Sequence, residues 1–200
     1  MIRLISTILI MMFLSMPAQA MSRVNAGMIR DAQEYGQRYS KQEPGVFLLP
    51  WTVYEERSVQ IGEAAERAYL YTPYLLIALN AKDNEQNGIS PKLEDSERIL
   101  SDYNGFLTFE TILYGDTAEF TSELSASLQQ DKKRIKQYQI VFPSKPKAII
   151  DRATGLKLYK AQGYIYFSDK GLNPTKPVRL AVIPADNRVR HFYFDLPRIR

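Results

Sequence analysis

Two consecutive sets of helix boundary signals constrain the fold more than any other feature of the sequence. Thr72 can cap a helix whose first residue is Pro73, and Gly88 suits the left-handed turn that ends many helices. Residues 74–79 are apolar on every side of this helix, whereas residues 82–87 are polar. The pattern predicts a helix whose N-terminal half lies in the protein core.

A second helix is predicted immediately after the first. Ser90 and Pro91 repeat the start signal, and Asn104 followed by Gly105 repeats the end signal. Between them, small and apolar side chains recur at helical spacing along one stripe, which is typical of a helix that buries only one side. The stripe consists of Leu93, Ser96, Ile99, Leu100 and Tyr103.

The segment before these helices predicts a further helix and an extended strap. Residues 25–40 carry apolar side chains at spacings of three and four, although Gly36 inside this helix costs about 1 kcal/mol relative to Ala. Residues 46–54 combine proline with aromatic side chains and predict an extended cover over the core. Trp51 is expected to be a core anchor, with a ligand platform as the alternative. Candidate strands follow at residues 58–61 and 67–71.

From residue 105 onward the pattern changes to the alternation of strands. Residues 106–114 are largely apolar on both faces, which predicts a central strand that is covered on both sides. Residues 177–183 and 189–196 form the clearest predicted hairpin, and residues 149–159 predict a loop around Thr154 and Gly155.

This succession predicts an α+β fold that is mainly antiparallel β. We expect a β-sandwich, immunoglobulin-like by analogy, in residues 105–200, flanked by about three helices from residues 21–104. The buried helix needs the sheet to cover it, so residues 21–200 are expected to form a single domain. No family is recognised in the sequence through motifs that would imply a function.

The first twenty residues resemble a secretory signal peptide. Arg3 precedes a short apolar run at residues 4–16, Pro17 interrupts the run, and Ala18-Gln19-Ala20 has the form that signal peptidase cleaves. A membrane span needs about 20 apolar residues, so a retained anchor is the less favoured alternative. We expect export to the periplasm or the cell surface after cleavage following Ala20.

The sequence contains no cysteine, which excludes disulfides, thiolate nucleophiles and thiolate metal sites. A loose acidic group at Asp116, Glu119 and Glu123 lacks the spacing and the glycine of a calcium loop. No glycine-rich phosphate loop is present, and the sole histidine, His191, has no second histidine for a metal site. No metal and no cofactor are therefore expected.

Charge is distributed unevenly along the sequence. Residues 21–131 hold 9 basic against 18 acidic side chains, whereas residues 132–200 hold 16 against 4. This asymmetry favours either a basic surface for an anionic partner or mutual compensation of the two halves in the fold. Basic residues also interleave with Tyr138 and Tyr193, but the export signal makes nucleic acid an unexpected partner. The candidate binding residues are Lys132, Lys133, Arg134, Arg179 and Arg190.

These features favour an exported, non-enzymatic binding or assembly module of the bacterial cell envelope. Its expected partner is an anionic envelope surface or another envelope protein. Two alternatives remain open: a hydrolase that uses carboxylates, with Glu110 as its candidate catalytic residue, and a subunit of a larger envelope complex. Glu110 lies among apolar neighbours in a predicted strand, and a basic partner is the more ordinary expectation for it.

Overall fold

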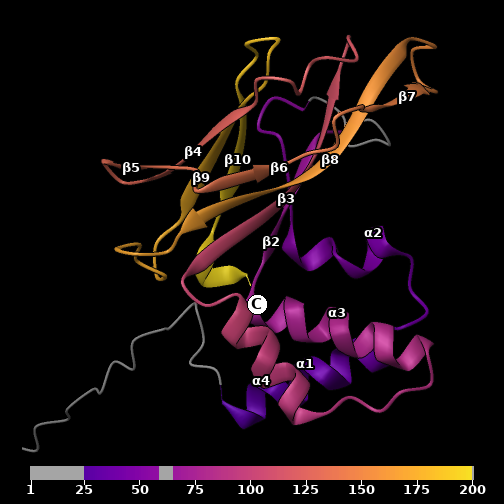
Figure 1. The fold of residues 1–200 in the computed structure, drawn as a ribbon, viewed down its shortest axis with the longest axis vertical. Coiled ribbons are helices and arrows are strands. Elements are labelled where there is room, and N and C mark those ends of the chain that lie inside the picture. Colours follow the sequence, from indigo (N-terminus) through magenta and orange to yellow (C-terminus); the bar gives the residue numbers. More distant parts are fainter. Residues whose placement is uncertain (1–24, 59–64, 200) are drawn as a thin grey trace, which may run out of the picture.

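The structure is a computed structural model that describes residues 25–58 and 65–199. The predicted signal peptide and most of the candidate strand at residues 58–61 lie outside the described residues. Helices gather at one end of the molecule, and two antiparallel sheets form the other end (Figure 1). Across the described ranges, no helix is both long and apolar enough to cross a bilayer.

The described residues contain four α-helices and two short 3-10 helices. Thr72 caps α3 as predicted, because its hydroxyl oxygen accepts a hydrogen bond from the backbone N–H of Leu75 at 3.1 Å. Gly88 adopts a φ of +68° just beyond the end of α3. The helix bounds are α1 Ala26–Arg38, α2 Pro44–Phe47, η1 Leu49–Trp51, α3 Pro73–Gln86, α4 Leu93–Asp102 and η2 Leu196–Arg198.

One sheet, which we call sheet A, has the strand order β1-β2-β3-β8-β6, and β7 pairs with the other end of β8. The central position predicted for residues 106–114 is confirmed, because β3 pairs with β2 on one side and with β8 on the other. The strand bounds are β1 Thr52–Tyr54, β2 Arg67–Tyr71, β3 Phe106–Gly115, β6 Gln139–Val141, β7 Lys147–Ile150 and β8 Lys157–Ser168.

The second sheet, sheet B, has the strand order β10-β9-β4-β5. The predicted C-terminal hairpin is confirmed as the antiparallel pair of β9 and β10. The strand bounds are β4 Ser125–Gln130, β5 Lys133–Lys136, β9 Val178–Ile183 and β10 Arg190–Phe194.

Two hydrophobic clusters hold the layers together. The first lies between the sheets and includes Phe109 and Phe167 of sheet A and Phe192 of sheet B. The second lies between the outer face of sheet A and the helices, where Trp51 is 1 % exposed. Trp51 is thus the predicted core anchor, with its ring centroid 6.2 Å from that of Tyr74. The fold is α+β with mainly antiparallel sheets in a sandwich-like arrangement, while the immunoglobulin-like analogy is not confirmed.

Three boundaries differ from the sequence prediction. Residues 46–54 form the end of α2, then η1 and β1, because Pro44 and Pro50 each occupy the first turn of a helix, where a missing N–H removes no hydrogen bond. The second predicted helix, α4, begins at Leu93 and not at the Ser90 signal. Residues 149–159 belong to the β7–β8 hairpin, whose turn is closed by Gly155 at a φ of +72°.

Candidate functional site

The outer face of sheet A, which faces away from sheet B, brings together the side chains of a candidate binding site. Alternation along β3 directs Phe106, Thr108 and Glu110 to this face. The strand register sets Thr108 opposite Tyr71 of β2 and opposite Tyr166 of β8. Because directly paired residues of antiparallel strands point to the same face, tyrosines flank β3 on both sides.

A groove of about 370 Å³ opens on this face, where α4 ends and β3 begins. Gly105, at a φ of +85°, allows the chain to turn from the helix into the strand. The backbone N–H of Tyr138 donates to the carbonyl oxygen of Tyr166 at 2.7 Å, and this bond fixes the start of β6 beside β8. We call this site the aromatic groove; its lining residues are Asp102, Tyr103, Phe106, Thr108, Tyr138, Gln139 and Tyr166.

The aromatic rings of the groove are open to solvent. Tyr138 is 70 % exposed, Tyr103 is 39 % exposed and Phe106 is 37 % exposed. The ring centroids of Phe106 and Tyr138 lie 5.2 Å apart, so the two rings form one surface. Exposed aromatic side chains that gather around a concavity with a few polar groups are typical of ligand sites.

Thr108 provides a polar atom at the floor of the aromatic groove. Its side chain is only 2 % exposed, and its hydroxyl oxygen has no hydrogen-bond partner among the described residues. A buried hydroxyl without a partner costs free energy, on the order of 1–3 kcal/mol. The oxygen is closed off from solvent, so a ligand hydroxyl in the groove would supply the missing hydrogen bond after a small shift of the surrounding side chains.

The tyrosines around β3 are held in the protonated form. Burial raises the pKa of Tyr166, and the neighbouring phenols of Tyr103 and Tyr164 raise it further. Burial also raises the pKa of Tyr71 and of Tyr164, and the negative charge of Glu110 adds to both shifts. At neutral pH these phenols are therefore hydrogen-bond donors.

Glu110 is buried beneath these tyrosines and is fully engaged. Its carboxylate accepts hydrogen bonds from the hydroxyl of Tyr71 and from the side-chain amide of Gln162. Both donors are neutral, so the basic partner expected from the sequence is replaced by a phenol and an amide. Glu110 does not line the aromatic groove. Its position is that of a side chain that orients Tyr71.

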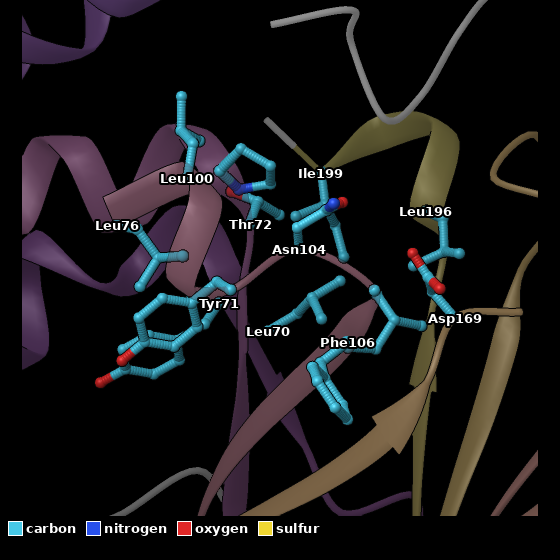
Figure 2. A pocket seen from close by; sticks show the side chains of 14 residues that line it. Leu70, Tyr71, Thr72, Leu76, Leu100, Asn104, Phe106, Asp169, Leu196 and Ile199 are labelled. Atoms are coloured by element: carbon cyan, nitrogen blue, oxygen red, sulfur yellow. The ribbon is translucent and has the colours of Figure 1, made fainter. Parts of the chain in front are cut away.

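An apolar cavity of about 220 Å³ adjoins the aromatic groove and shares Tyr103 and Phe106 with it. Figure 2 shows its wall, in which Leu76 and Leu100 come from the helices and Leu196 comes from the C-terminal segment. The cavity extends the accessible apolar surface beyond the rings of the groove, so a ligand in the groove can place an apolar group there.

The structure does not bring the five predicted basic residues together. Arg190 is 1 % exposed and is paired with Glu66 at 3.0 Å and with Asp186 at 2.6 Å, so the proposal that it contacts a surface ligand is wrong. Strand register places Arg190 opposite the buried Val182, whereas Arg179 lies opposite the exposed Tyr193 on the other face of sheet B.

The remaining basic candidates lie on the edge strand β5, at the β4–β5 turn before it and on the inner strand β9 of sheet B. Arg134 and Arg179 lie opposite the same residue of β4, Gln129, and therefore share the outer face of the sheet. Arg179 is already paired with Glu56. Lys132 is exposed at the β4–β5 turn, and the ammonium of Lys133 donates to two backbone carbonyl oxygens of the β8–β9 connection.

The two charge halves of the sequence compensate each other in part. Acidic residues of the first half pair with basic residues of the second, as Glu66 does with Arg188 and Arg190, and as Asp131 does with Lys176. Among the described residues, no three acidic or histidine side chains converge as metal ligands. His191 is half-buried on β10, where burial and the charge of Arg179 lower its pKa.

The aromatic groove was not predicted from the sequence. Its residues come from the end of α4, from β3, from the β5–β6 connection, from β6 and from β8. Strand register and the turn from α4 into β3 bring them together. The signal that could have indicated it is the tyrosine content, 13 in the whole sequence, because tyrosine combines apolar surface with a polar hydroxyl and is enriched at binding surfaces.

Comparisons with known proteins add little to this geometry. No family model and no curated protein matches the sequence. A solved structure described as a novel protein of unknown function from Burkholderia pseudomallei is similar over 89 % of this chain and 93 % of its own, with 10 % sequence identity and a TM-score of 0.41.

Proposed function

We propose that this chain is an exported, non-enzymatic binding module of the bacterial cell envelope and that its ligand binds in the aromatic groove. Export rests on the signal-peptide pattern of residues 1–20, with cleavage following Ala20. The binding role rests on the groove itself. Residues 21–200 would form one domain in which the sandwich-like pair of sheets supports this site.

The observation that carries the proposal is the pairing of exposed rings with an unpartnered buried hydroxyl. Tyr103, Phe106 and Tyr138 offer aromatic surface, and Thr108 offers a polar atom that lacks a hydrogen bond within the described residues. Sugar rings have apolar C–H faces that pack against aromatic rings and hydroxyl groups at their edges that bond to polar side chains. We therefore propose a neutral stretch of a cell-wall glycan as the ligand.

Basic residues of β5 and of the turn before it provide a secondary contact in this proposal. Lys132, Lys133 and Arg134 are exposed, and a cell wall or a membrane surface carries anionic groups. Their contribution would be electrostatic and would weaken as salt rises, because exposed charges are screened over about 10 Å at 0.1 M salt.

The two alternative functions have less support from the geometry. A hydrolase would place a carboxylate in an open cleft, whereas both oxygens of Glu110 are bonded beneath Tyr71 and Gln162. Assembly through an open sheet edge would need a long unprotected strand. The edge strand β5 has four residues, three of them basic, and the backbone of His191 on β10 is bonded by Glu55 and Glu56.

The test compares two threonine variants in co-sedimentation with isolated cell wall. Thr108→Val removes the hydroxyl from the groove, and we expect wall binding to weaken by about threefold to tenfold, as one lost hydrogen bond of about 1 kcal/mol implies. Thr111→Val is the matched control, because its hydroxyl is also buried without a partner in the described structure but lies on the opposite face of β3. Neither change should reduce the free energy of unfolding.

Three outcomes separate the functions. Loss of binding in Thr108→Val but not in Thr111→Val supports the groove. Equal binding by the unchanged protein, Thr108→Val and Thr111→Val, with no effect of Tyr138→Ala, would show that the aromatic groove is not the binding site. Release of soluble fragments from the wall by the unchanged protein, abolished in Glu110→Gln, would establish the hydrolase instead.

A further inference from the structure

A second cavity, of about 400 Å³, opens on the same side of sheet A but at the opposite end of β8. Six positions of β8 separate its lysine, Lys160, from Tyr166 in the aromatic groove, which corresponds to about 20 Å along a strand. We call it the cationic cleft; its lining residues are Arg67, Tyr114, Ile149, Ile150, Asp151, Arg152 and Lys160.

Two lysines face each other across neighbouring strands at the cleft. Lys147 of β7 lies directly opposite Lys160 of β8, so both side chains point to the same face. Like charges in directly opposed positions destabilise a sheet. Among the residues that the structure describes, neither ammonium has a hydrogen-bond or ion-pair partner. This arrangement carries a cost that a bound anion would remove.

Arg67 adds a third positive charge and is held in place. Its Nε donates to the hydroxyl of Tyr69 at 2.7 Å, and its Nη1 donates to the carbonyl oxygen of Ala65 at 3.1 Å. These neutral partners fix the guanidinium without neutralising it. The hydroxyl of Tyr114, which also lines the cleft, is a further hydrogen-bond partner of this guanidinium.

The acidic residues near the cleft are engaged elsewhere. Asp151 lines the cleft, but its carboxylate accepts hydrogen bonds from the hydroxyl of Thr154 at 2.5 Å and from the N–H of Ala153 at 3.2 Å, within its own turn. Glu66 is bonded to Arg188 and Arg190. The neutral donors leave the negative charge of Asp151 in place, so the cleft holds this one carboxylate beside its basic side chains, and Glu66 adds no further compensation.

The pKa of Lys160 reflects the positive charges that surround it. Burial lowers the pKa of Lys160, and the nearby charges of Arg67 and Lys147 lower it further. An anion bound between these groups would oppose that shift.

We propose that the cationic cleft binds a phosphate group. The guanidinium of Arg67 and the ammonium of Lys160 line the cavity, and the ammonium of Lys147 lies beside them on the neighbouring strand. Together they match the two or three charged oxygens of a phosphate, and arginine donors suit phosphate geometry in particular. The inference does not depend on the aromatic groove, because the two sites share no lining residue.

The test is calorimetric titration of the purified protein with inorganic phosphate at low ionic strength and pH 7. We expect saturable binding that weakens at least tenfold in Lys160→Gln and at least threefold in Lys147→Gln. Lys147 is exposed, so its variant keeps the test valid if Lys160→Gln fails to fold. Lys170→Gln removes the same charge from the β8–β9 connection, at the opposite end of β8, and should bind within twofold of the unchanged protein.

Two further titrations identify the source of the phosphate. One uses glycerol 3-phosphate, and the other uses vesicles of phosphatidylglycerol compared with neutral phosphatidylcholine. Stronger binding of either probe, with the same dependence on Lys160, assigns the cleft to that source. No saturable binding of any of the three probes, or an equal loss in Lys170→Gln and Lys160→Gln, would overturn the proposal and would leave the aromatic groove unaffected.

Discussion

Gly36 determines how closely α1 and α3 approach each other. It is buried in α1, and a Cβ at this position would lie 2.2 Å from the carbonyl oxygen of Ala78 in α3. The sequence indicated only the helix-propensity cost of this glycine. The structure shows that the cost is offset by close backbone packing, which no pattern within α1 alone can reveal.

We therefore expect Gly36→Ala to destabilise the protein. Because the obstructing atom belongs to the backbone, the helices must separate, at a cost of about 1–3 kcal/mol that exceeds the gain of about 1 kcal/mol in helix propensity. Urea unfolding measures the change. Gly45→Ala is the control, since a Cβ there meets no atom within 4 Å, and equal stability of the two variants would contradict the packing argument.

Within α3, Lys82 departs from the burial that the sequence pattern predicts. The sequence placed it at the start of the polar half of the helix, yet it is buried, and its ammonium donates to the carbonyl oxygens of Ser40 at 2.5 Å and Gln42 at 2.7 Å. These carbonyls follow the end of α1, where helices leave acceptors without partners. Lys82 thereby joins the end of one helix to the side of another.

Lys82→Met should leave the carbonyl of Gln42 without this donor, whereas the carbonyl of Ser40 keeps the side-chain amide of Gln86 at 2.6 Å. We expect a loss of about 1–3 kcal/mol in the free energy of unfolding, the usual cost of unsatisfied buried acceptors. Thermal and urea unfolding would measure it. Lys41→Met, in the same connection but exposed, should change stability by less than about 0.5 kcal/mol. A similar effect of both substitutions would mean that Lys82 contributes only surface charge.

The elements that the sequence predicted are those with local signals. α3 carries its own cap and terminator, and β3 alternates over its whole length, so both were placed correctly. The β7–β8 hairpin was missed because the exposed Lys147–Ile150 strand depends on pairing with β8 for its structure. The aromatic groove was missed for the same reason, since it depends on register between segments distant in the sequence.

At the scale of the whole molecule, Arg190 connects the two sheets. From β10 of sheet B it donates to Glu66 at 3.0 Å and to the carbonyl oxygen of Tyr114 in β3 at 2.9 Å. Asp186 accepts two hydrogen bonds from the same guanidinium, at 2.6 Å and 2.7 Å. Basic and acidic residues from the two halves of the sequence thus neutralise each other in part inside the fold, which is the mutual compensation that the sequence allowed.

This network predicts that the free energy of unfolding decreases at acidic pH. Burial alone would raise the pKa of Asp186, but hydrogen bonds and charge from Arg190 and Arg188 bring it below its usual value. A carboxyl whose pKa is lower in the folded state contributes stability above its unfolded pKa of about 3.9 and loses it as pH falls through the folded value. Urea midpoints should therefore fall below about pH 4, and less steeply in Asp186→Asn. Asp83→Asn, an exposed control, should keep the original slope.

The most direct test of the central claim is to follow the tyrosine ring signals by NMR while soluble cell-wall glycan fragments are added. If the aromatic groove binds the ligand, the signals of Tyr103, Tyr138 and Tyr166 will shift with one common affinity. Tyr193, which is 51 % exposed on the outer face of sheet B, will remain unchanged. Shifts of Tyr193 equal to those of Tyr138, or no shift at any of these rings, would contradict the claim.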